Sequence, residues 1–106
     1  MPKKQEYFTL KFPARVLPTV VQEMDRQVQD ALAQGHHTIA FDWSESEYVD
    51  SYAVGVVFRA YQALMPKGGK VAVVCPSPKV KPTMDALDLK NLIQCFDTVE
   101  EFEKSL

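Results

Sequence analysis

The chain has 106 residues, of which 46% are hydrophobic and 25% are charged, and its formal net charge is −2. These values are typical of one small globular domain, here residues 1–106, and they exclude a disordered chain, which would have fewer apolar residues and a larger net charge. The weakly acidic balance offers no basic stripe of the kind that marks nucleic-acid-binding domains, so we expect no nucleic-acid partner.

The cellular compartment follows from the N-terminus and from the apolar runs. Residues 1–5 are polar and have no apolar stretch behind them, which predicts that there is no signal peptide. No apolar run approaches the ~18 residues that a membrane-spanning helix needs. We therefore expect a cytoplasmic domain without direct membrane insertion. In that compartment Cys75 and Cys95, which stand in apolar runs without metal-ligand spacing, should be buried free thiols.

The first half of the chain predicts a strand, a helix and a second strand. Residues 7–12 alternate apolar and polar side chains, which is typical of a strand with one solvated face. Residues 18–34 carry apolar side chains at helical spacing, with a proline in the first turn and a glycine just past the end. Residues 37–41 predict the second strand, and a polar loop that holds the only tryptophan, Trp43, follows it.

The second half predicts two strands among three helices. Residues 51–65 are apolar almost all round, so this helix should be packed on more than one side, and the lone Gly55 within it should have a packing reason. Residues 70–75 form an apolar run after their first lysine, which predicts an interior strand covered on both faces. The remaining expected elements are a helix capped by Ser77 with Pro78 in its first turn, or else starting at Pro82, that carries Val80, Met84 and Leu87; a strand at residues 92–96; and a helix capped by Asp97 or Thr98 that buries Val99 and Phe102.

Strand and helix alternate throughout, in the order β-α-β-α-β-α-β-α. This order predicts an α/β fold with a small mixed, mostly parallel sheet of four to five strands and about four packed helices. In such sheets binding sites lie beyond the carboxyl ends of the strands. Here those ends lead into residues 42–51, 76–78 and 97–98, so these segments should carry the function.

The middle of the chain contains a recognisable succession of motifs. A strand ending in Asp42 leads through a polar loop to Tyr-Val-Asp-Ser-Tyr-Ala-Val-Gly at residues 48–55, which opens the apolar helix. A Lys-Gly-Gly-Lys turn, a valine-rich strand and Phe-Asp-Thr-Val-Glu-Glu at residues 96–101 follow. Over about two thirds of its length the chain thus resembles the STAS domain of anti-sigma-factor antagonists.

The core motif of that family, Asp-Ser-Ser/Thr-Gly-Leu/Ile-Gly, is matched here in part. Asp50, Ser51 and Gly55 are present, whereas Tyr52 stands where the family has a small hydroxyl residue and Ala53 where it has glycine. The resemblance implies that Ser51 accepts a phosphoryl group from a partner kinase that is itself the anti-sigma factor, and that Asp50 helps to position Ser51.

The start of this helix has a second, purely structural interpretation. A phosphate at a helix N-terminus is favoured by free backbone N–H groups and by the positive end of the helix dipole. Asp50 and Ser51 before an apolar helix are equally typical of a plain N-cap.

The neighbouring loops add candidates for a partner interface, whose aromatic members also suit core packing: Trp43, Ser44, Tyr48, Tyr52 and Ser77.

Catalytic and metal-binding motifs are missing from the sequence. His36 and His37 have no third ligand nearby, and there is no P-loop, GxSxG or GxGxxG. We therefore expect a protein-binding module rather than an enzyme, with no cofactor and no metal. Two functions remain open: an anti-sigma-factor antagonist switched by phosphorylation of Ser51, with an anti-sigma factor or switch kinase as partner, and an accessory subunit of a transport complex or signalling scaffold in which Ser51 is not modified.

Overall fold

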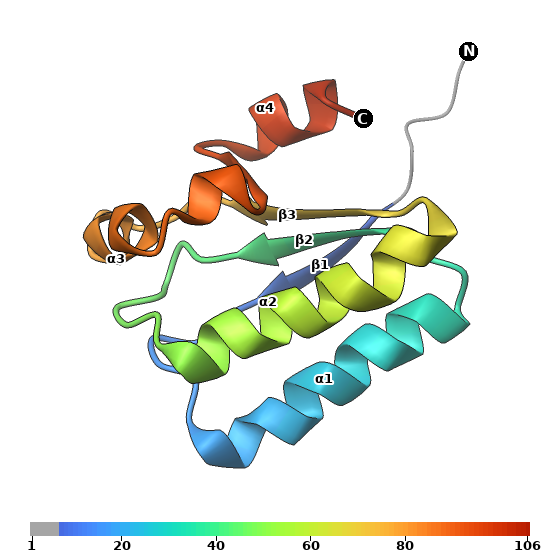
Figure 1. Ribbon diagram of the computed structural model, residues 1–106, viewed down its shortest axis with the longest axis horizontal. Helices are drawn as coiled ribbons and strands as arrows, with labels where there is room; N and C mark the ends of the chain where they lie inside the picture. Colours follow the sequence, from blue (N-terminus) through green and yellow to red (C-terminus); the bar gives the residue numbers. More distant parts are fainter. Residues whose placement is uncertain (1–6) are drawn as a thin grey trace.

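The computed structural model describes residues 7–106; the polar residues 1–5, which predicted the absence of a signal peptide, lie outside this range. The described chain folds into strands and helices in the expected alternating order (Figure 1). Their bounds are β1 Phe8–Lys11, α1 Pro18–Ala33, β2 Thr38–Asp42, α2 Ser51–Leu64, the 3-10 helix η1 Met65–Lys67, β3 Lys70–Val74, α3 Lys81–Ala86, the 3-10 helix η2 Leu89–Asn91, β4 Gln94–Phe96 and α4 Val99–Lys104.

The four strands form one sheet in the order β1-β2-β3-β4, and each neighbouring pair is parallel. The expected fold class is therefore confirmed, with no antiparallel pair in the sheet that residues 7–106 form. The prediction for β3 is also confirmed, because β3 lies between β2 and β4 and its residues 71–74 are buried. An apolar run without alternation reflects burial on both faces of the sheet.

Helices cover the sheet in two unequal layers. In Figure 1, α1 and α2 lie side by side below the sheet and α4 lies above it. The lower face holds the main core, to which β3 contributes Val71 and Val73, and α3 adds Met84 to the same cluster. The upper face holds a smaller core, in which Ala72 and Val74 pack with Phe102 of α4. None of the helices within residues 7–106 is long and apolar enough to cross a membrane.

The start of α3 differs from the first of the two expected positions. The helix begins at Lys81, and Pro82 stands in its first turn, so the second proline rather than Pro78 marks the start. Ser77 does not cap this helix; its hydroxyl instead donates to the carbonyl oxygen of Ser46 at 2.5 Å. The helix ends at Ala86, and Leu87 at its C-cap is 46% exposed, so the expectation that Leu87 packs on the core face of the helix is wrong.

The last helix is capped as expected but buries less than expected. Thr98 is the N-cap residue, and its Oγ1 accepts a hydrogen bond from the backbone N–H of Glu101 at 3.1 Å. Phe102 is fully buried, whereas Val99, the first helical residue, is 39% exposed. The expectation that Val99 is a core residue is therefore wrong: Val99 shares a face with Phe102 but stands at the exposed first position of a six-residue helix.

Two glycines have opposite surroundings. A Cβ atom built on Gly69 would lie 2.5 Å from the carbonyl oxygen of His37 and 2.8 Å from Cδ2 of Leu64, so this position has no room for a side chain. A Cβ on Gly55 would meet only the end of the Arg59 side chain, which is flexible and half exposed. The close packing expected around Gly55 is therefore not found, and the crowding around Gly69 was not expected from the sequence.

Alanine substitutions at Gly69 and Gly55 should have different effects on stability. We expect Gly69→Ala to lower the free energy of unfolding by ~1–3 kcal/mol, because the backbone carbonyl of His37 cannot yield to a new methyl group. Gly55→Ala should leave stability unchanged or raise it by up to ~1 kcal/mol, because alanine favours a helix over glycine. Urea denaturation of both variants measures the difference, and equal losses would contradict this assignment.

Candidate functional site

The carboxyl ends of the parallel strands meet at one end of the molecule, on the left in Figure 1. The loop before α2 is tied there to both neighbouring loops. On one side the backbone N–H groups of Glu47 and Tyr48 donate to the carbonyl oxygen of Ala14 at 2.8 and 3.0 Å. On the other side Ser77 donates to Ser46. These bonds fix the path of the chain into α2, so that the residues at its start occupy defined positions.

Trp43 anchors the same loop from below. Its side chain is fully buried and its ring packs 5.7 Å from the ring of Phe12, measured between centroids. Its backbone carbonyl accepts hydrogen bonds from the N–H groups of Ser46 and Ser77. Of the two alternatives for this residue, the structure adopts core packing. Trp43 therefore acts through the loop that it holds, and its ring is not available to a partner.

The carboxylate of Asp50 caps α2. Asp50 has an extended backbone, and its Oδ1 accepts hydrogen bonds from the N–H groups of Tyr52 at 3.1 Å and Ala53 at 3.3 Å. Ser51 is the first helical residue and is exposed. The N-cap predicted from the sequence is present and is made by Asp50. Its carboxylate therefore occupies N–H groups at the helix start that a phosphate on Ser51 had been expected to use.

Three of the remaining interface candidates are exposed around this helix start. Tyr48 is 65% exposed with the guanidinium of Arg15 lying 5.3 Å from its ring centroid, and Tyr52 is 46% exposed. Ser44 is exposed, and its backbone N–H donates to Asp42 at 2.8 Å. Ser77, by contrast, is half buried and engaged with Ser46.

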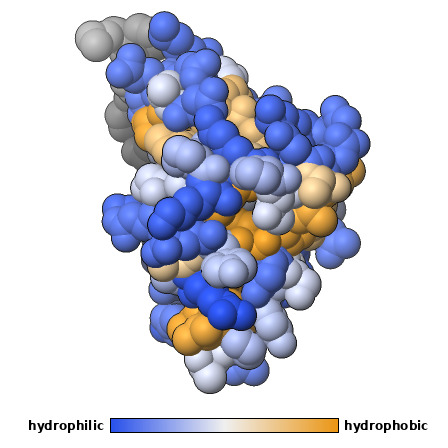
Figure 2. Space-filling model, turned by 90° about the vertical axis from the view of Figure 1, so that its left-hand side faces the viewer, coloured by the Kyte–Doolittle hydropathy of each residue, from blue (hydrophilic) through white to orange (hydrophobic). Residues whose placement is uncertain are grey.

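An apolar hollow of about 390 Å³ adjoins Ser51. In Figure 2, which shows this end of the molecule, hydrophobic surface gathers in the middle of the face and hydrophilic residues surround it. Sequence reasoning missed this hollow, because its walls come from two segments far apart in the sequence: the start of α2, and Thr83 and Leu87 in and just after α3. The residues that line it are Val49, Asp50, Ser51, Val54, Gly55, Thr83 and Leu87.

The two cysteines lie away from this hollow and form no disulfide with each other. Both are partly buried, and burial raises the pKa of each thiol above its usual value. A raised pKa keeps the thiol protonated and weakly nucleophilic at neutral pH. The free state expected for both thiols is confirmed, although neither is fully buried. Among the described residues, no group of three histidine, cysteine or acidic side chains could hold a metal ion.

The described residues thus form a four-stranded parallel sheet with an Asp-Ser pair at the start of α2. The family model of the STAS domain matches residues 1–102. The chain therefore belongs to the STAS domain family.

A protein of Thermotoga maritima named "Putative anti-sigma factor antagonist" is 29% identical over 70 residues, which make up 66% of this chain and 62% of that protein. A Thermotoga neapolitana homologue is 27% identical over the same shares of both chains. The chain thus spans about 62% of the length of the curated relatives it matches.

Solved structures share the fold. The crystal structure of the Thermotoga maritima protein TM1081 is 24% identical, with 92% of this chain and 86% of that chain covered and a TM-score of 0.79. The anti-sigma factor antagonist SpoIIAA in its unphosphorylated form is 21% identical, with 92% and 84% covered and a TM-score of 0.76. The phosphorylated form of the Bacillus protein SpoIIAA is 20% identical, with 99% and 94% covered and a TM-score of 0.63.

Removal of the cap should cost stability without affecting the core. We expect Asp50→Ala to lower the free energy of unfolding by ~0.5–2 kcal/mol, because two N–H groups at the start of α2 lose their acceptor. Asp50→Asn should retain most of that stability, and Ser51→Ala should change it by less than ~0.5 kcal/mol. Urea denaturation compares the three variants. If Ser51→Ala lowers the free energy of unfolding as much as Asp50→Ala does, the assignment of the cap to Asp50 is contradicted.

Proposed function

We propose that this domain is a non-enzymatic, cytoplasmic regulatory module that binds a kinase-like protein partner, such as an anti-sigma factor or switch kinase, and that phosphorylation of Ser51 switches this binding off. The observation that supports the proposal is the place of Ser51: an exposed residue beside an apolar hollow, with two exposed tyrosines nearby. Exposed apolar and aromatic surface of this kind suits a protein interface. The names of the relatives, "Putative anti-sigma factor antagonist" and the anti-sigma factor antagonist SpoIIAA, support the same class of function.

The switch follows from the charge of the product. The phosphoryl group passes from a nucleoside triphosphate held by the partner to Oγ of Ser51, and a nucleoside diphosphate and the hydroxyl proton leave. Phosphoserine adds roughly −1.5 to −2 charges at pH 7. A partner that covers the hollow would have to remove water from this charge, which is costly. The domain itself should stay folded, because the side chain of Ser51 is exposed and makes no core contact.

A second candidate function has its own support. The Asp50 carboxylate already occupies the N–H groups of Tyr52 and Ala53, and the half-exposed Tyr52 stands directly beside the acceptor. Both features disfavour a kinase that expects a small residue and an open helix start. They favour an accessory subunit that stays docked in a transport complex or signalling scaffold, with Ser51 unmodified.

Binding measurements on serine variants distinguish the two functions. With the kinase-like protein encoded in the same genome as partner, we expect Ser51→Asp to weaken binding by about 10-fold or more, which corresponds to ~1.4 kcal/mol. Ser51→Ala should bind like the wild type. Ser105→Asp is the matched control, because Ser105 is an exposed serine at the C-terminal end of α4, outside the hollow and outside the interface candidates.

Mass spectrometry of the protein from its native cell completes the test. Phosphate on the peptide that contains Ser51, together with the loss of binding in Ser51→Asp, is the expected result. If Ser51 is never modified and Ser51→Asp binds as tightly as the wild type, the switch is absent and the accessory-subunit function replaces it.

A further inference from the structure

The side chain of Arg59 folds back along α2 and lies over Gly55. A Cβ atom built on Gly55 would be 2.9 Å from Nη1 and 3.5 Å from Nη2 of Arg59. The planar guanidinium can therefore rest against the helix only because residue 55 has no side chain. This contact explains why a glycine stands at position 55 of the helix, which core packing does not explain.

The guanidinium is held in place from α1. Nε of Arg59 donates to Oδ2 of Asp25 at 3.0 Å, and this ion pair joins α1 to α2. Arginine has five N–H donors in a fixed planar arrangement. Within residues 7–106, the donors on Nη1 and Nη2 form no hydrogen bond and lie on the side of Gly55. One edge of the group is therefore anchored, and the other edge is open to an acceptor.

Ser51 lies one helical turn before Gly55 on the same face. Residues four apart on a helix have Cβ atoms ≈ 5–6 Å from each other. Ser51 and Gly55 also line the same hollow. Because the guanidinium covers the Gly55 position, its open edge lies about one turn from the Ser51 hydroxyl. A phosphoryl group would lengthen the serine side chain toward that edge.

Two lysines at this end of the molecule are already paired with carboxylates, and the guanidinium of Arg15 lies over the ring of Tyr48. Lys11 pairs with Glu45 at 2.7 Å, and Lys79 pairs with Glu47 at 3.1 Å. The helix start is occupied by the Asp50 carboxylate. A phosphate on Ser51 therefore needs a further partner, and a guanidinium suits it, because arginine binds phosphate oxygens through two parallel hydrogen bonds.

We propose that Gly55 and Arg59 form a receiving site for a phosphoryl group on Ser51, in which Nη1 and Nη2 of Arg59 donate to the phosphoryl oxygens while Nε remains on Asp25. This inference rests on the proposed function, since it concerns the modified form of Ser51. The phosphoryl group held in this way lies across the end of the apolar hollow that Gly55 lines. Modification thus covers apolar surface as well as adding charge, and both effects oppose docking of the partner.

The test installs phosphoserine at position 51 of the full chain during synthesis, so that no kinase is needed. The titration of this phosphate is then followed by ³¹P NMR. The second pKa of phosphoserine is ≈ 6, and a neighbouring cation lowers it. We expect a pKa in the otherwise wild-type protein that is lower than in Arg59→Gln by about 0.5–1 unit, the lower end of the effect of a close cation because the site is exposed. The carboxylates that face this site, Asp50 and Asp25, are present in both proteins, and the loss of the Asp25 ion pair in Arg59→Gln acts in the same direction, toward a higher phosphate pKa.

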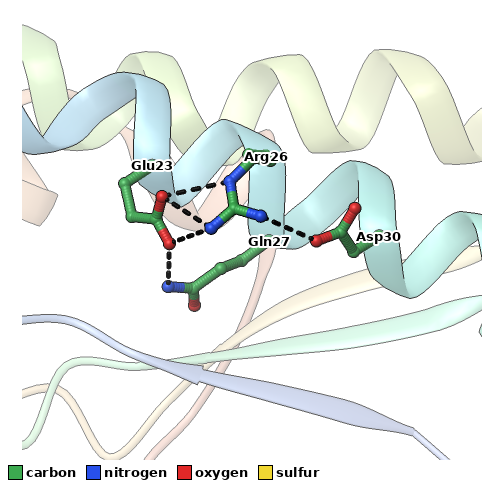
Figure 3. Close-up of polar contacts among 4 residues, drawn as sticks. All are labelled: Glu23, Arg26, Gln27 and Asp30. Atoms are coloured by element: carbon green, nitrogen blue, oxygen red, sulfur yellow. Dashed lines mark hydrogen bonds and ion pairs between the residues drawn. The ribbon is translucent and has the colours of Figure 1, made fainter.

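Two further variants separate a local contact from a general charge effect. Arg26→Gln removes the same charge from α1, where Arg26 is engaged by Glu23 and Asp30 (Figure 3), and it should leave the phosphate pKa unchanged. Gly55→Ala keeps Arg59 but places a methyl group where its guanidinium rests, and it should raise the pKa toward that of Arg59→Gln. Thermal melts verify that each variant is folded.

Equal pKa values in wild type and Arg59→Gln, or an equal shift in Arg26→Gln, would overturn the receiving site. These outcomes are independent of whether Ser51 is phosphorylated in the cell, which the native mass spectrum decides. Failure of the receiving site and failure of the phosphorylation switch are therefore distinguishable.

Discussion

The carboxylate of Asp50 closes the N-terminus of α2 by accepting hydrogen bonds from the N–H groups of Tyr52 and Ala53. The placement of Ser51 follows from that cap. Since α2 begins directly after Asp50, Ser51 is its first residue and leaves the helix toward solvent. The same carboxylate takes up the positive end of the helix, so a phosphate on Ser51 has to find its counter-charge elsewhere. The cap and the proposed regulatory site thus lie in the same turn of the helix but use different groups: the carboxylate of Asp50 and the hydroxyl of Ser51.

The loop before α2, which carries Asp50, is hydrogen-bonded to the neighbouring loop on each side. The geometry of the candidate site therefore depends on three loops. Ala14 accepts two N–H groups from it, Ser77 donates to it, and Trp43 fixes it from the core. The hollow beside Ser51 needs α2 on one wall and the residues around Leu87 on the other. A partner that reads this face would therefore recognise the assembled fold rather than a linear peptide.

Much of the fold was predictable because its signals are local. The apolar run of β3, the alternation in β1 and the Asp-Ser start of α2 each reflect burial or capping within a few residues. The start of α3 was ambiguous, since Pro78 and Pro82 both suit a first turn, and its end at Ala86, which leaves Leu87 at the C-cap, had no local signal. The burial of Trp43 and the course of Arg59 were not predictable from local sequence. Trp43 stands in a polar loop, and Arg59 depends on Asp25 of another helix.

The strands stand in the sheet in the same order as along the chain. Each new strand therefore adds to the edge left by the previous one, and none has to insert between two strands already paired. Such a chain can assemble unit by unit as it leaves the ribosome, since synthesis releases the N-terminal part first. The cap and Ser51 precede β3, whereas Thr83 and Leu87 follow it. Ser51 is thus synthesised early, but the apolar hollow beside it is complete only after Thr83 and Leu87 have been synthesised and have packed next to α2.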